Sequence, residues 1–414
     1  MISVEEAREL ILSKVSGLDC QEVPLVESLG CVLAEDVTTD GDISPFDNSG
    51  MDGFALLSSD VEDASEQSPV RLRIMAHIGA GYTYDDTVTS GQAVRIMTGA
   101  ATPSGIDAVE KIENVTFTGE GTVGDELIIS KPVKQAQNVR FSGEEAKAGE
   151  VVMRAGQTIL PAGMGLLSSA GRGTVKVYRR PHVGVIALGS ELMDPTDRLL
   201  PGKLRDSNSY ALAGQALAAG CTVTRYGRVD DDPELISAAL AKAVDECDFV
   251  VTSGGASAGD YDFITQVAGD LGEVLFKYVN MRPGKSQTFA VIDGTPFVGL
   301  AGNPSAAAVG FEMLVRPALL KMQGHAALLR PTQKAILGQG LRRGNSRRQY
   351  LRGTIARDGQ GRLVATPAGK QSSALLGALV HGNCLIIIPA NSGALDEGAP
   401  VECIRLDVGE GVFI

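Results

Sequence analysis

The chain has 414 residues, more than one hydrophobic core usually serves, so we expect two to four domains. Hydrophobic residues make up 44% of the sequence and charged residues 21%, as in soluble globular proteins; 50 glycines and only 5% aromatic residues favour short strands and tight turns over a helical bundle. The net charge of -13 argues against nucleic acid or an anionic membrane as the main partner, but leaves room for a small anionic ligand.

Cysteines and histidines are scattered along the chain and do not have the spacing of a zinc site. They are Cys20, Cys31, Cys221, Cys247, Cys384 and Cys403, and His77, His182, His325 and His381. The opening sequence MISVEEAREL is acidic where a signal peptide is cationic, and no apolar run reaches the ~20 residues of a membrane span. We therefore expect a reduced, cytoplasmic protein without a membrane segment.

The first part of the chain combines helical signals with β-rich sequence. Ser3 and Glu6 have the spacing of a capping box, which predicts a helix at the start of the chain. A second helix is expected over residues 27–37, and Pro161 suits the first turn of a third. From about residue 58 to 139, short apolar runs separated by glycines predict a small β-rich domain.

A regular alternation of strands and helices follows. Asp232 is placed to cap a helix with Pro233 at its first position, and a last helix is expected to bend at Pro317. The alternation predicts a doubly wound, mostly parallel sheet that binds ligands at the carboxyl ends of its strands. The predicted strands are HVGVIAL (182–188), CTVTRYGRV (221–229), DFVVTSG (248–254), EVLFKYV (273–279), SQTFAVI (286–292) and PFVGL (296–300).

These patterns together predict a multidomain α/β and β protein. The expected domains are a mixed α/β domain of residues 1–45 plus 140–180, an inserted β-rich domain of residues 46–139, the doubly wound domain of residues 181–328, and a C-terminal β-barrel of residues 329–414.

The stretch VVTSGGASAGDYDF (250–263) follows a predicted strand and precedes a predicted helix, which is where α/β sheets bind anions. Ser253, Gly254, Gly255 and Ser257 offer unobstructed backbone amides, and the following helix adds its positive end. The loop is neither a Walker A sequence nor a dinucleotide-binding fingerprint. A plain glycine-rich connection is the alternative, and phosphate binding is favoured over it.

Other loops of the same sheet also carry polar residues at strand ends. They place Glu191 after the first strand, Asp230 and Asp231 after the second, and Asn303 and Pro304 at the start of the last helix. Arg282 and Lys285, in the segment MRPGKS, are the close cation pair near these loops. Carboxylates that hold Mg²⁺, with amides and cations that hold phosphates, would suit a nucleotide or another phosphorylated ligand. Each acidic loop alone also fits a solvated surface or a helix cap.

The segment PFDNSGMDGFAL (45–56) places Asp47 and Asp52 around a glycine-containing turn. An Asx-rich turn is the simplest interpretation of it. RIMTGA (95–100) and NVRFSGEEAKAG (138–149) likewise place polar residues next to glycine after a short strand, which makes a mere connecting role less convincing.

Seven segments of the chain, in order, resemble motifs of the molybdopterin molybdenumtransferase family, the MoeA and gephyrin E-domain proteins. They are NSGMDGFA, RIMTGA, NVRFSGEEAKAG, ALGSEL, TSGGASAGDYD, RPGK and GNPSAA. The resemblance covers nearly the whole chain and implies an L-shaped homodimer of four-domain subunits with a site between the subunits. The implied reaction needs Mg²⁺ and converts adenylylated molybdopterin and molybdate to molybdenum cofactor and AMP.

The resemblance also implies site residues. Positions implicated in catalysis or in handling metal and molybdate are Asp52, Thr98, Glu145, Glu191, Asp231 and Asp262, with Asp230 as the alternative to Asp231. Glu191, Asp231 and Asp262 are the expected Mg²⁺ ligands. The residues expected to bind molybdopterin, its phosphates and molybdate are Ser253, Gly254, Gly255, Ser257, Gly259, Asp260, Arg282, Lys285, Asn303, Pro304, Ser305 and Ser373.

Two residues depart from the resembled pattern. Glu145 stands where the family commonly has an aspartate, and Ala301 where it often has a proline. Either change is compatible with unchanged activity, with altered metal or anion affinity, or with a paralogue of altered activity. The choice between molybdate and tungstate stays open.

The leading interpretation is a transferase of cofactor biosynthesis, with a molybdopterin adenylyltransferase and molybdoenzymes as possible partners. A carrier or scaffold that binds molybdopterin with little turnover is the second interpretation, and the retained acids Asp52, Glu191, Asp231 and Asp262 argue against it. An adenylyltransferase or nucleotide hydrolase is the third, and the flanking domains and the sequence GGASAGDYD argue against that.

Overall fold

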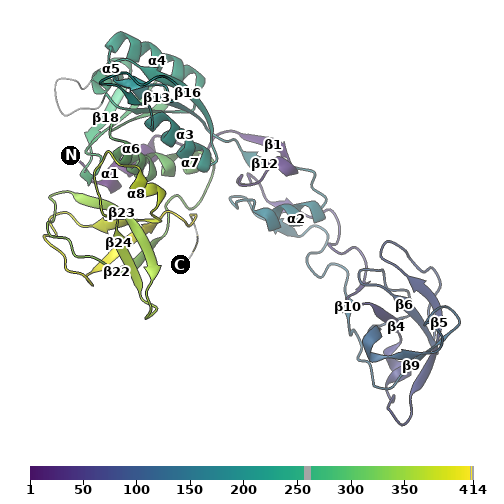
Figure 1. Ribbon diagram of the computed structural model, residues 1–414. Coiled ribbons are helices and arrows are strands. Elements are labelled where there is room, and N and C mark those ends of the chain that lie inside the picture. The colour runs from purple at the N-terminus through teal and green to yellow at the C-terminus, as the bar shows by residue number, and fades with distance from the viewer. Residues whose placement is uncertain (256–262, 411, 413–414) are drawn as a thin grey trace.

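The computed structural model of the protein describes residues 1–255, 263–410 and 412. The molecule is elongated (Figure 1): an α/β domain and a C-terminal barrel lie side by side at one end and a β-rich domain lies at the other. A narrow segment containing β1 (Cys20–Pro24), β12 (Thr174–Tyr178) and α2 (Pro161–Ser169) joins the two ends. None of the helices in these described parts is long and apolar enough to cross a membrane.

The first helix, α1 (Val4–Ser13), begins as the capping box predicts. The Glu6 backbone N–H donates to Ser3 Oγ at 3.1 Å, and the Ser3 backbone N–H donates to the Glu6 carboxylate at 2.7 Å. Val4 and Ile11 of this helix are buried in the core of the α/β domain. The start of the chain is therefore packed against elements that lie far along the sequence.

The helix predicted over residues 27–37 is wrong. Only a 3-10 turn, η1 (Leu25–Glu27), forms here, and Gly30 adopts a φ of +78°, which takes the chain out of helical geometry. Val32 and Leu33 are then fully buried and form bridges to other segments. The apolar residues of this stretch thus pack as extended chain, because pairing with distant strands satisfies their backbone groups.

The narrow segment is built from strands that are distant in sequence. β1 pairs antiparallel with β12, and β2 (Val37–Thr38) pairs with β11 (Val151–Met153). α2 begins at Pro161, as predicted, where the missing N–H of proline costs no hydrogen bond. Residues before and after the β-rich domain thus share one small core.

The β-rich domain contains a six-stranded sheet of order β7-β4-β6-β5-β9-β8. Its elements are β4 (Gly53–Leu56), η2 (Ser58–Val61), β5 (Val70–Ile78), β6 (Gln92–Ile96), β7 (Ala108–Lys111), η3 (Ile112–Asn114), β8 (Thr116–Phe117) and β9 (Glu126–Ile129). At its junction with the narrow segment, β3 (Asn48–Ser49) pairs with β10 (Val139–Arg140). Two of the sequence motifs are thereby brought side by side.

The α/β domain has a six-stranded sheet of order β16-β13-β17-β21-β20-β18. Its strands are β13 (His182–Leu188), β16 (Thr222–Val229), β17 (Phe249–Ser253), β18 (Glu273–Tyr278), β20 (Ser286–Ile292) and β21 (Thr295–Leu300). The first four strands in the sheet order are parallel, and β20 runs antiparallel to both of its neighbours, β21 and β18. The prediction of a doubly wound, mostly parallel sheet is confirmed.

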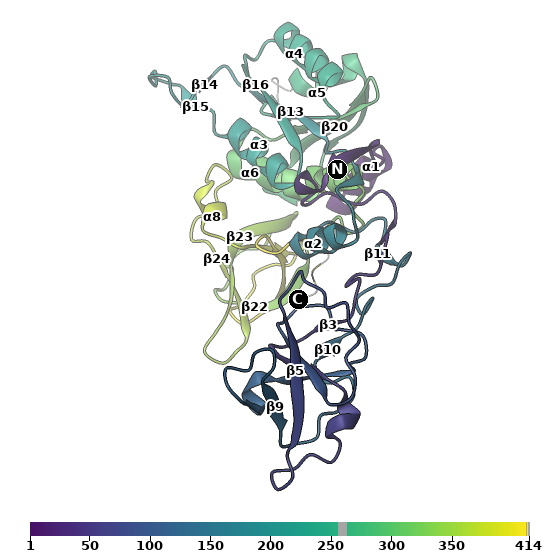
Figure 2. The same cartoon turned by 90° about the vertical axis from the view of Figure 1, so that its right-hand side faces the viewer.

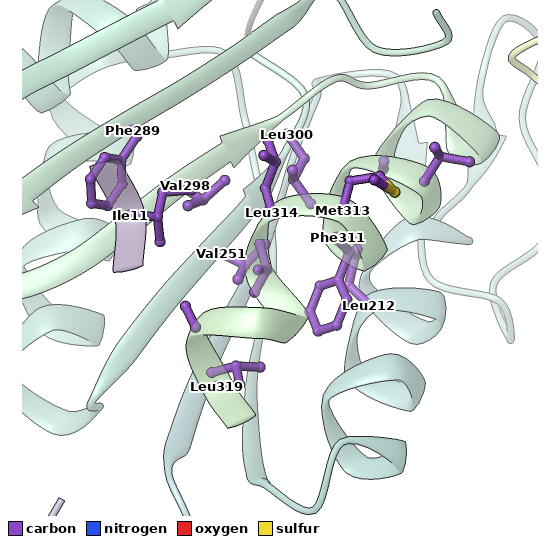
Figure 3. Packing of buried hydrophobic residues seen from close by; sticks show 14 of the residues in the cluster. Ile11, Leu212, Val251, Phe289, Val298, Leu300, Phe311, Met313, Leu314 and Leu319 are labelled. Atoms are coloured by element: carbon purple, nitrogen blue, oxygen red, sulfur yellow. The ribbon is translucent and has the colours of Figure 1, made fainter. Parts of the chain in front are cut away.

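Helices cover both faces of this sheet. α4 (Pro233–Glu246) and α5 (Phe263–Leu271) pack on one face, whereas α1 and α3 (Asn208–Ala218) pack on the other. Figure 3 shows the second face, where Phe289 and Val251 of the sheet meet apolar side chains of the helices. Asp232 caps α4 as predicted, since its Oδ1 accepts from two backbone N–H groups of the first turn, at 2.9 and 3.2 Å.

The last helical stretch of the α/β domain runs without a break over residues 304–322. It consists of α6 (Pro304–Gly310), a π-helical turn η4 (Phe311–Val315) and α7 (Arg316–Met322). Pro317 is the second residue after the π turn. A proline cannot donate the helical N–H to the preceding turn, and the wider π turn accommodates that loss.

The C-terminal region forms a closed barrel in which β23 pairs with β24 and β25, and β22 and β26 complete the ring. Its elements are β22 (Thr332–Leu337), β23 (Arg348–Arg357), β24 (Leu363–Pro367), α8 (Gly377–Val380), β25 (Cys384–Ile388) and β26 (Pro400–Arg405). The predicted barrel is confirmed. β19 (Met281–Arg282) of the α/β domain adds to its sheet by pairing parallel with β23.

A buried ion pair fastens the end of the chain to the α/β domain. Arg316 is 7% exposed, and its Nε donates to Glu410 Oε1 at 2.6 Å. Burial by itself would raise the pKa of Glu410, but the hydrogen bonds and charge of Arg316 outweigh burial and lower that pKa. The stability that a lowered carboxyl pKa provides is complete above the unfolded-state pKa and is lost as the pH falls through the folded-state pKa.

We predict that Glu410→Gln lowers the free energy of unfolding at pH 7 by about 2 kcal/mol, because among the described residues Arg316 then keeps Glu312 as its one, more distant, ion-pair partner, at 3.7 Å. The variant should also lose part of the wild-type decline in stability below about pH 4.5. Denaturant unfolding across pH measures both effects. Glu126→Gln, in the exposed pair with Arg71, is the matched control and should change little. Equal behaviour of the two variants would contradict the prediction.

Candidate active site

The loops after β13 and β16 are joined at the carboxyl edge of the α/β sheet. Ser190 N–H donates to Asp231 Oδ2 at 3.1 Å, and Asp231 N–H donates to Ser190 Oγ at 3.0 Å. Glu191 follows Ser190 directly and is exposed, at the base of the projecting pair β14 (Leu192–Met193) and β15 (Leu204–Arg205) that Figure 2 shows. Asp230 instead pairs with Arg228 at 2.9 Å. Asp231 is therefore the acid that lies beside the Glu191 loop.

The glycine loop begins in close contact with β13. Gly254 has a φ of +97°, and a Cβ there would lie 2.1 Å from the Leu188 carbonyl oxygen, so only glycine fits. Its N–H donates to the Leu300 carbonyl at 3.2 Å, which ties the loop to the end of β21. Ser253 and Gly255 are placed beside it, at the sheet edge. The other predicted residues of this loop, Ser257, Gly259, Asp260 and Asp262, lie outside the described residues.

A cavity of about 570 Å³ lies between the α/β domain and the barrel. Pairing of β19 with β23 sets Arg282 opposite Gln349, and so brings the RPGK segment onto the barrel. The residues that line the cavity are Arg282, Pro283, Gly284, Lys285, Ser286, Ala301, Gly302, Asn303, Ala306, Arg347, Gln349, Leu351, Arg352, Gln371, Ser372 and Ser373. Four predicted binding residues, Arg282, Lys285, Asn303 and Ser373, thus face one space. Pro304 and Ser305 adjoin it, with the Ser305 N–H donating to the Ser373 carbonyl at 2.8 Å.

The charge of this cavity is positive. Arg282, Lys285, Arg347 and Arg352 line it, and no Asp or Glu is among the described residues that do so. Arg352 is only 1% exposed; burial lowers its pKa, and the nearby charge of Arg282 lowers it further. Its Nη2 donates to the Ser372 carbonyl at 2.9 Å, while its Nε has no hydrogen-bond partner within the described part of the chain. Crowded, desolvated cations of this kind favour a bound anion.

Sequence reasoning missed Arg347, Arg352 and Gln371 of this cavity. Arg347 Nη1 donates to the Met281 carbonyl at 3.1 Å, and Gln371 exchanges hydrogen bonds with the Arg352 backbone at 2.8 and 3.1 Å. The segment RRQYLRG (347–353) is basic in an acidic protein, which is the one local signal that could have marked them. Their shared cavity follows from pairing with β19.

Asp52 and Thr98 meet in the β-rich domain, at the neighbouring ends of β4 and β6. Asp52 Oδ1 accepts from both the backbone N–H and the hydroxyl of Thr98, each at 2.7 Å. These two hydrogen bonds, the backbone one first, lower the pKa of Asp52, so its exposed carboxyl group is an anion near neutral pH. Gly99 N–H donates to the Ser49 carbonyl at 2.8 Å, which holds the two motifs together.

Glu145 lies on an exposed loop at the same junction. The loop is anchored by Ser142, whose N–H donates to Asp47 Oδ1 at 2.7 Å, and by the bridge between Ala146 and Ile43. The predicted residues therefore fall into two groups in one chain. Figure 1 places the domain of Asp52, Thr98 and the Glu145 loop at the opposite end of the molecule from the α/β sheet and the cavity.

No group of three or more His, Cys, Asp and Glu side chains that could hold a metal ion occurs among residues 1–255, 263–410 and 412. The predicted ligands Glu191 and Asp231 lie on adjoining loops, and the third, Asp262, is outside these ranges.

The fold and the cavity define a multidomain α/β protein with a cationic cavity beside the edge of its parallel strands. Family models described as the MoeA N-terminal region (domain I and II), a probable molybdopterin binding domain and the MoeA C-terminal region (domain IV) match residues 2–171, 184–321 and 334–406. The chain belongs to the MoeA family of transferases.

Relatives named molybdopterin molybdenumtransferase are similar in sequence to nearly the whole chain. A molybdopterin molybdenumtransferase of Staphylococcus aureus is 37% identical over 404 residues, 97% of this chain and 95% of the relative. One of Bacillus subtilis is 36% identical over 410 residues, 98% of this chain and 94% of the relative. The crystal structure of a molybdopterin biosynthesis MoeA protein from Pyrococcus horikoshii OT3 is similar with a TM-score of 0.81 and 30% identity, covering 98% of this chain and all (100%) of that one.

We predict that Gly254→Ala destabilises the protein more than Gly294→Ala does. Both glycines have positive φ, +97° and +84°, but a Cβ at Gly294 meets nothing within 4 Å. The control substitution therefore costs only backbone strain, about 1 kcal/mol, whereas Gly254→Ala must also separate β17 from β13 and should cost at least about 2 kcal/mol more. Thermal and denaturant unfolding measure the difference. Equal losses would contradict the close contact with Leu188.

Proposed function

We propose that the protein transfers molybdenum from molybdate to adenylylated molybdopterin and releases AMP. The observation that carries this proposal is the cationic cavity beside the glycine loop. Molybdate is a tetrahedral dianion, and Lys285, Arg352 and Ser373 supply charges and a hydroxyl group suited to it. The amide of Gly255, a short distance along the sheet edge, suits a phosphate of the nucleotide substrate, whereas the Gly254 N–H is already bonded to the Leu300 carbonyl.

The reaction that we propose also uses Mg²⁺. Glu191 and Asp231 fit this ion, because they present hard carboxylate oxygens on exposed, hydrogen-bonded loops. Bound there, Mg²⁺ would polarise the phosphoanhydride and stabilise negative charge on the departing AMP. The chain itself would orient the anions and keep the cavity between the α/β domain and the barrel free of competing carboxylates.

We further propose that a second copy of the chain completes the site. Asp52 and Thr98 adjoin β4 and β6, whereas Glu191 and Asp231 follow β13 and β16, and Figure 1 places these two pairs of strands at opposite ends of the molecule. Phe46, Met51 and Phe141 are exposed around the Asp52 motif, where a partner surface would cover them. In the resulting dimer, Asp52 of one subunit would face the α/β sheet edge of the other.

A carrier that binds molybdopterin without turnover is not favoured. The Asp52–Thr98 pair and the joined Glu191 and Asp231 loops keep exposed carboxylates that binding alone would not need. Contacts with a molybdopterin adenylyltransferase and with molybdoenzymes stay predictions.

AMP release from adenylylated molybdopterin by the purified protein tests the proposed reaction. We expect release that requires both molybdate and Mg²⁺. Arg352→Met should raise the molybdate concentration needed for half-maximal AMP release about 10- to 100-fold. The methionine side chain has a similar length but lacks the buried charge-assisted donor. Arg357→Met, on the same strand but bonded to the Gly361 carbonyl outside the cavity, is the control. Release without molybdate, or equal effects of the two variants, would contradict the proposal.

Mixing two inactive variants tests the shared site. Asp52→Asn and Glu191→Gln homodimers should each be inactive, while a 1:1 mixture that exchanges subunits should recover about a quarter of wild-type activity, because half of the dimers then hold one intact site. A site built within one chain would give no recovery.

A further inference from the structure

Asn208 spans two loops at the carboxyl edge of the α/β sheet. It is the first residue of α3 and is half-buried. Its Nδ2 donates to Ser253 Oγ at 2.5 Å and to the Gly302 carbonyl at 2.7 Å. Ser253 ends β17, immediately before the glycine loop, and Gly302 follows β21 in the wall of the cationic cavity. One side chain thus bonds to both anion-binding loops.

The chemistry of the two acceptors fixes the orientation of the amide. A carbonyl oxygen such as that of Gly302 only accepts, so the NH₂ end of Asn208 must face it, and a flipped amide would set two acceptors against each other. Both N–H bonds of Nδ2 are then used, one on each loop. Ser253 Oγ accepts and keeps its own proton for donation.

The two loops also touch directly. Gly254 N–H donates to the Leu300 carbonyl at 3.2 Å, and a Cβ on Gly302 would lie 3.4 Å from Gly254 Cα. Small displacements of either loop therefore move the other. A side chain that pins both would set the distance between the phosphate amides and the cavity wall.

The start of α3 is held independently of Asn208. Asp206 is 5% exposed and accepts from the backbone N–H of Ser209 at 3.0 Å and from its hydroxyl. Arg225 donates to Ser209 Oγ at 2.8 Å and stacks 3.5 Å above the centre of the Tyr210 ring. Because this cluster fixes the helix, Asn208 is not needed to build α3 and its amide can be assigned to the loops.

We infer that Asn208 is a positioning residue, which holds the glycine loop and the cavity wall in register so that phosphate and oxyanion are bound at the distance the reaction needs. The effect of Asn208 on catalysis rests on the proposed function, whereas its coupling of the two loops does not depend on that function. Asn208 is not among the site residues predicted from the sequence.

Two variants and one control test the inference. Asn208→Ala removes the bridge, and Asn208→Asp keeps the shape of the side chain but removes both N–H donors and repels the Gly302 carbonyl. Gln215→Ala is the control, because Gln215 lies on the same helix and makes the same kind of bond, from Nε2 to the Ala308 carbonyl at 3.0 Å, away from the cavity.

Hydrogen exchange of the amides of residues 253–255 and 300–303, measured without substrate, reports the coupling. We expect exchange about 10-fold faster in both Asn208 variants and unchanged in Gln215→Ala. In AMP release, kcat should fall about 10-fold or more in both Asn208 variants, while the molybdate dissociation constant, measured by calorimetry, should stay within about 3-fold of wild type.

Unchanged exchange, or unchanged kcat in an active enzyme, would overturn the inference. An Asn208→Asp variant that behaves like wild type would also overturn it, because the shape of the side chain would then be enough. So would a Gln215→Ala control that loses as much kcat and melting temperature as the Asn208 variants, because the effect would then be one of general stability. A wild-type protein that releases no AMP would instead refute the proposed function, and the exchange measurement would still decide whether Asn208 couples the loops.

Discussion

A short strand pairing between two domains brings together the residues of the cationic cavity. β19 and β23 lie parallel, so that Arg282, the first residue of the RPGK segment, pairs with Gln349 near the start of β23. The pairing gathers four cationic side chains into one cavity, although like charges in a desolvated space repel one another. Backbone carbonyls relieve part of that repulsion, with Met281 accepting from Arg347 and Ser372 from Arg352. A bound dianion would relieve the rest, which is why the cavity suits an oxyanion.

Glycines set how closely the neighbouring loops approach this cavity. Gly254 allows the end of β17 to pass against the Leu188 carbonyl, and the loop after β21 lies on Gly254, where an added Cβ at Gly302 would make an ordinary contact at 3.4 Å. The close contact makes the sheet edge a single surface, and Asn208 bonds across it. At the far end of the molecule, Thr98 fixes the carboxylate of Asp52 by two hydrogen bonds. Two pre-shaped half-sites at opposite ends of an elongated chain are the reason that we propose a dimer.

Features that depend on local sequence could be predicted. The capping box at Ser3, the cap at Asp232 and the proline start of α2 each use contacts within one helical turn, and the alternating apolar runs define the sheet. Glu191, Asp231 and Lys285 were marked because polar residues after buried strands gather at one sheet edge. The helix predicted over residues 27–37 does not form, because extended pairing with distant strands outweighs a helical pattern that Gly30 interrupts.

Features that depend on contacts between distant segments could not be predicted. Arg347 and Arg352 become part of the site only when the barrel docks on β19, and no local pattern encodes that register. The role of Asn208 likewise depends on the Ser253 hydroxyl and the Gly302 carbonyl, which lie 45 and 94 residues further along the chain. The family resemblance implied a site between two subunits, but neither it nor the residues themselves predicted that Asp52 and Glu191 would lie in separate groups within one chain.

The position of molybdate in a crystal shows whether the cationic cavity binds the oxyanion. Anomalous diffraction at the molybdenum edge, from crystals soaked in molybdate, locates the metal without reference to any bound substrate. We expect a peak in the cavity between the α/β domain and the barrel, within hydrogen-bonding reach of Lys285, Arg352 and Ser373. A peak at the exposed Glu191 and Asp231 loops, with the cationic cavity empty, would contradict it.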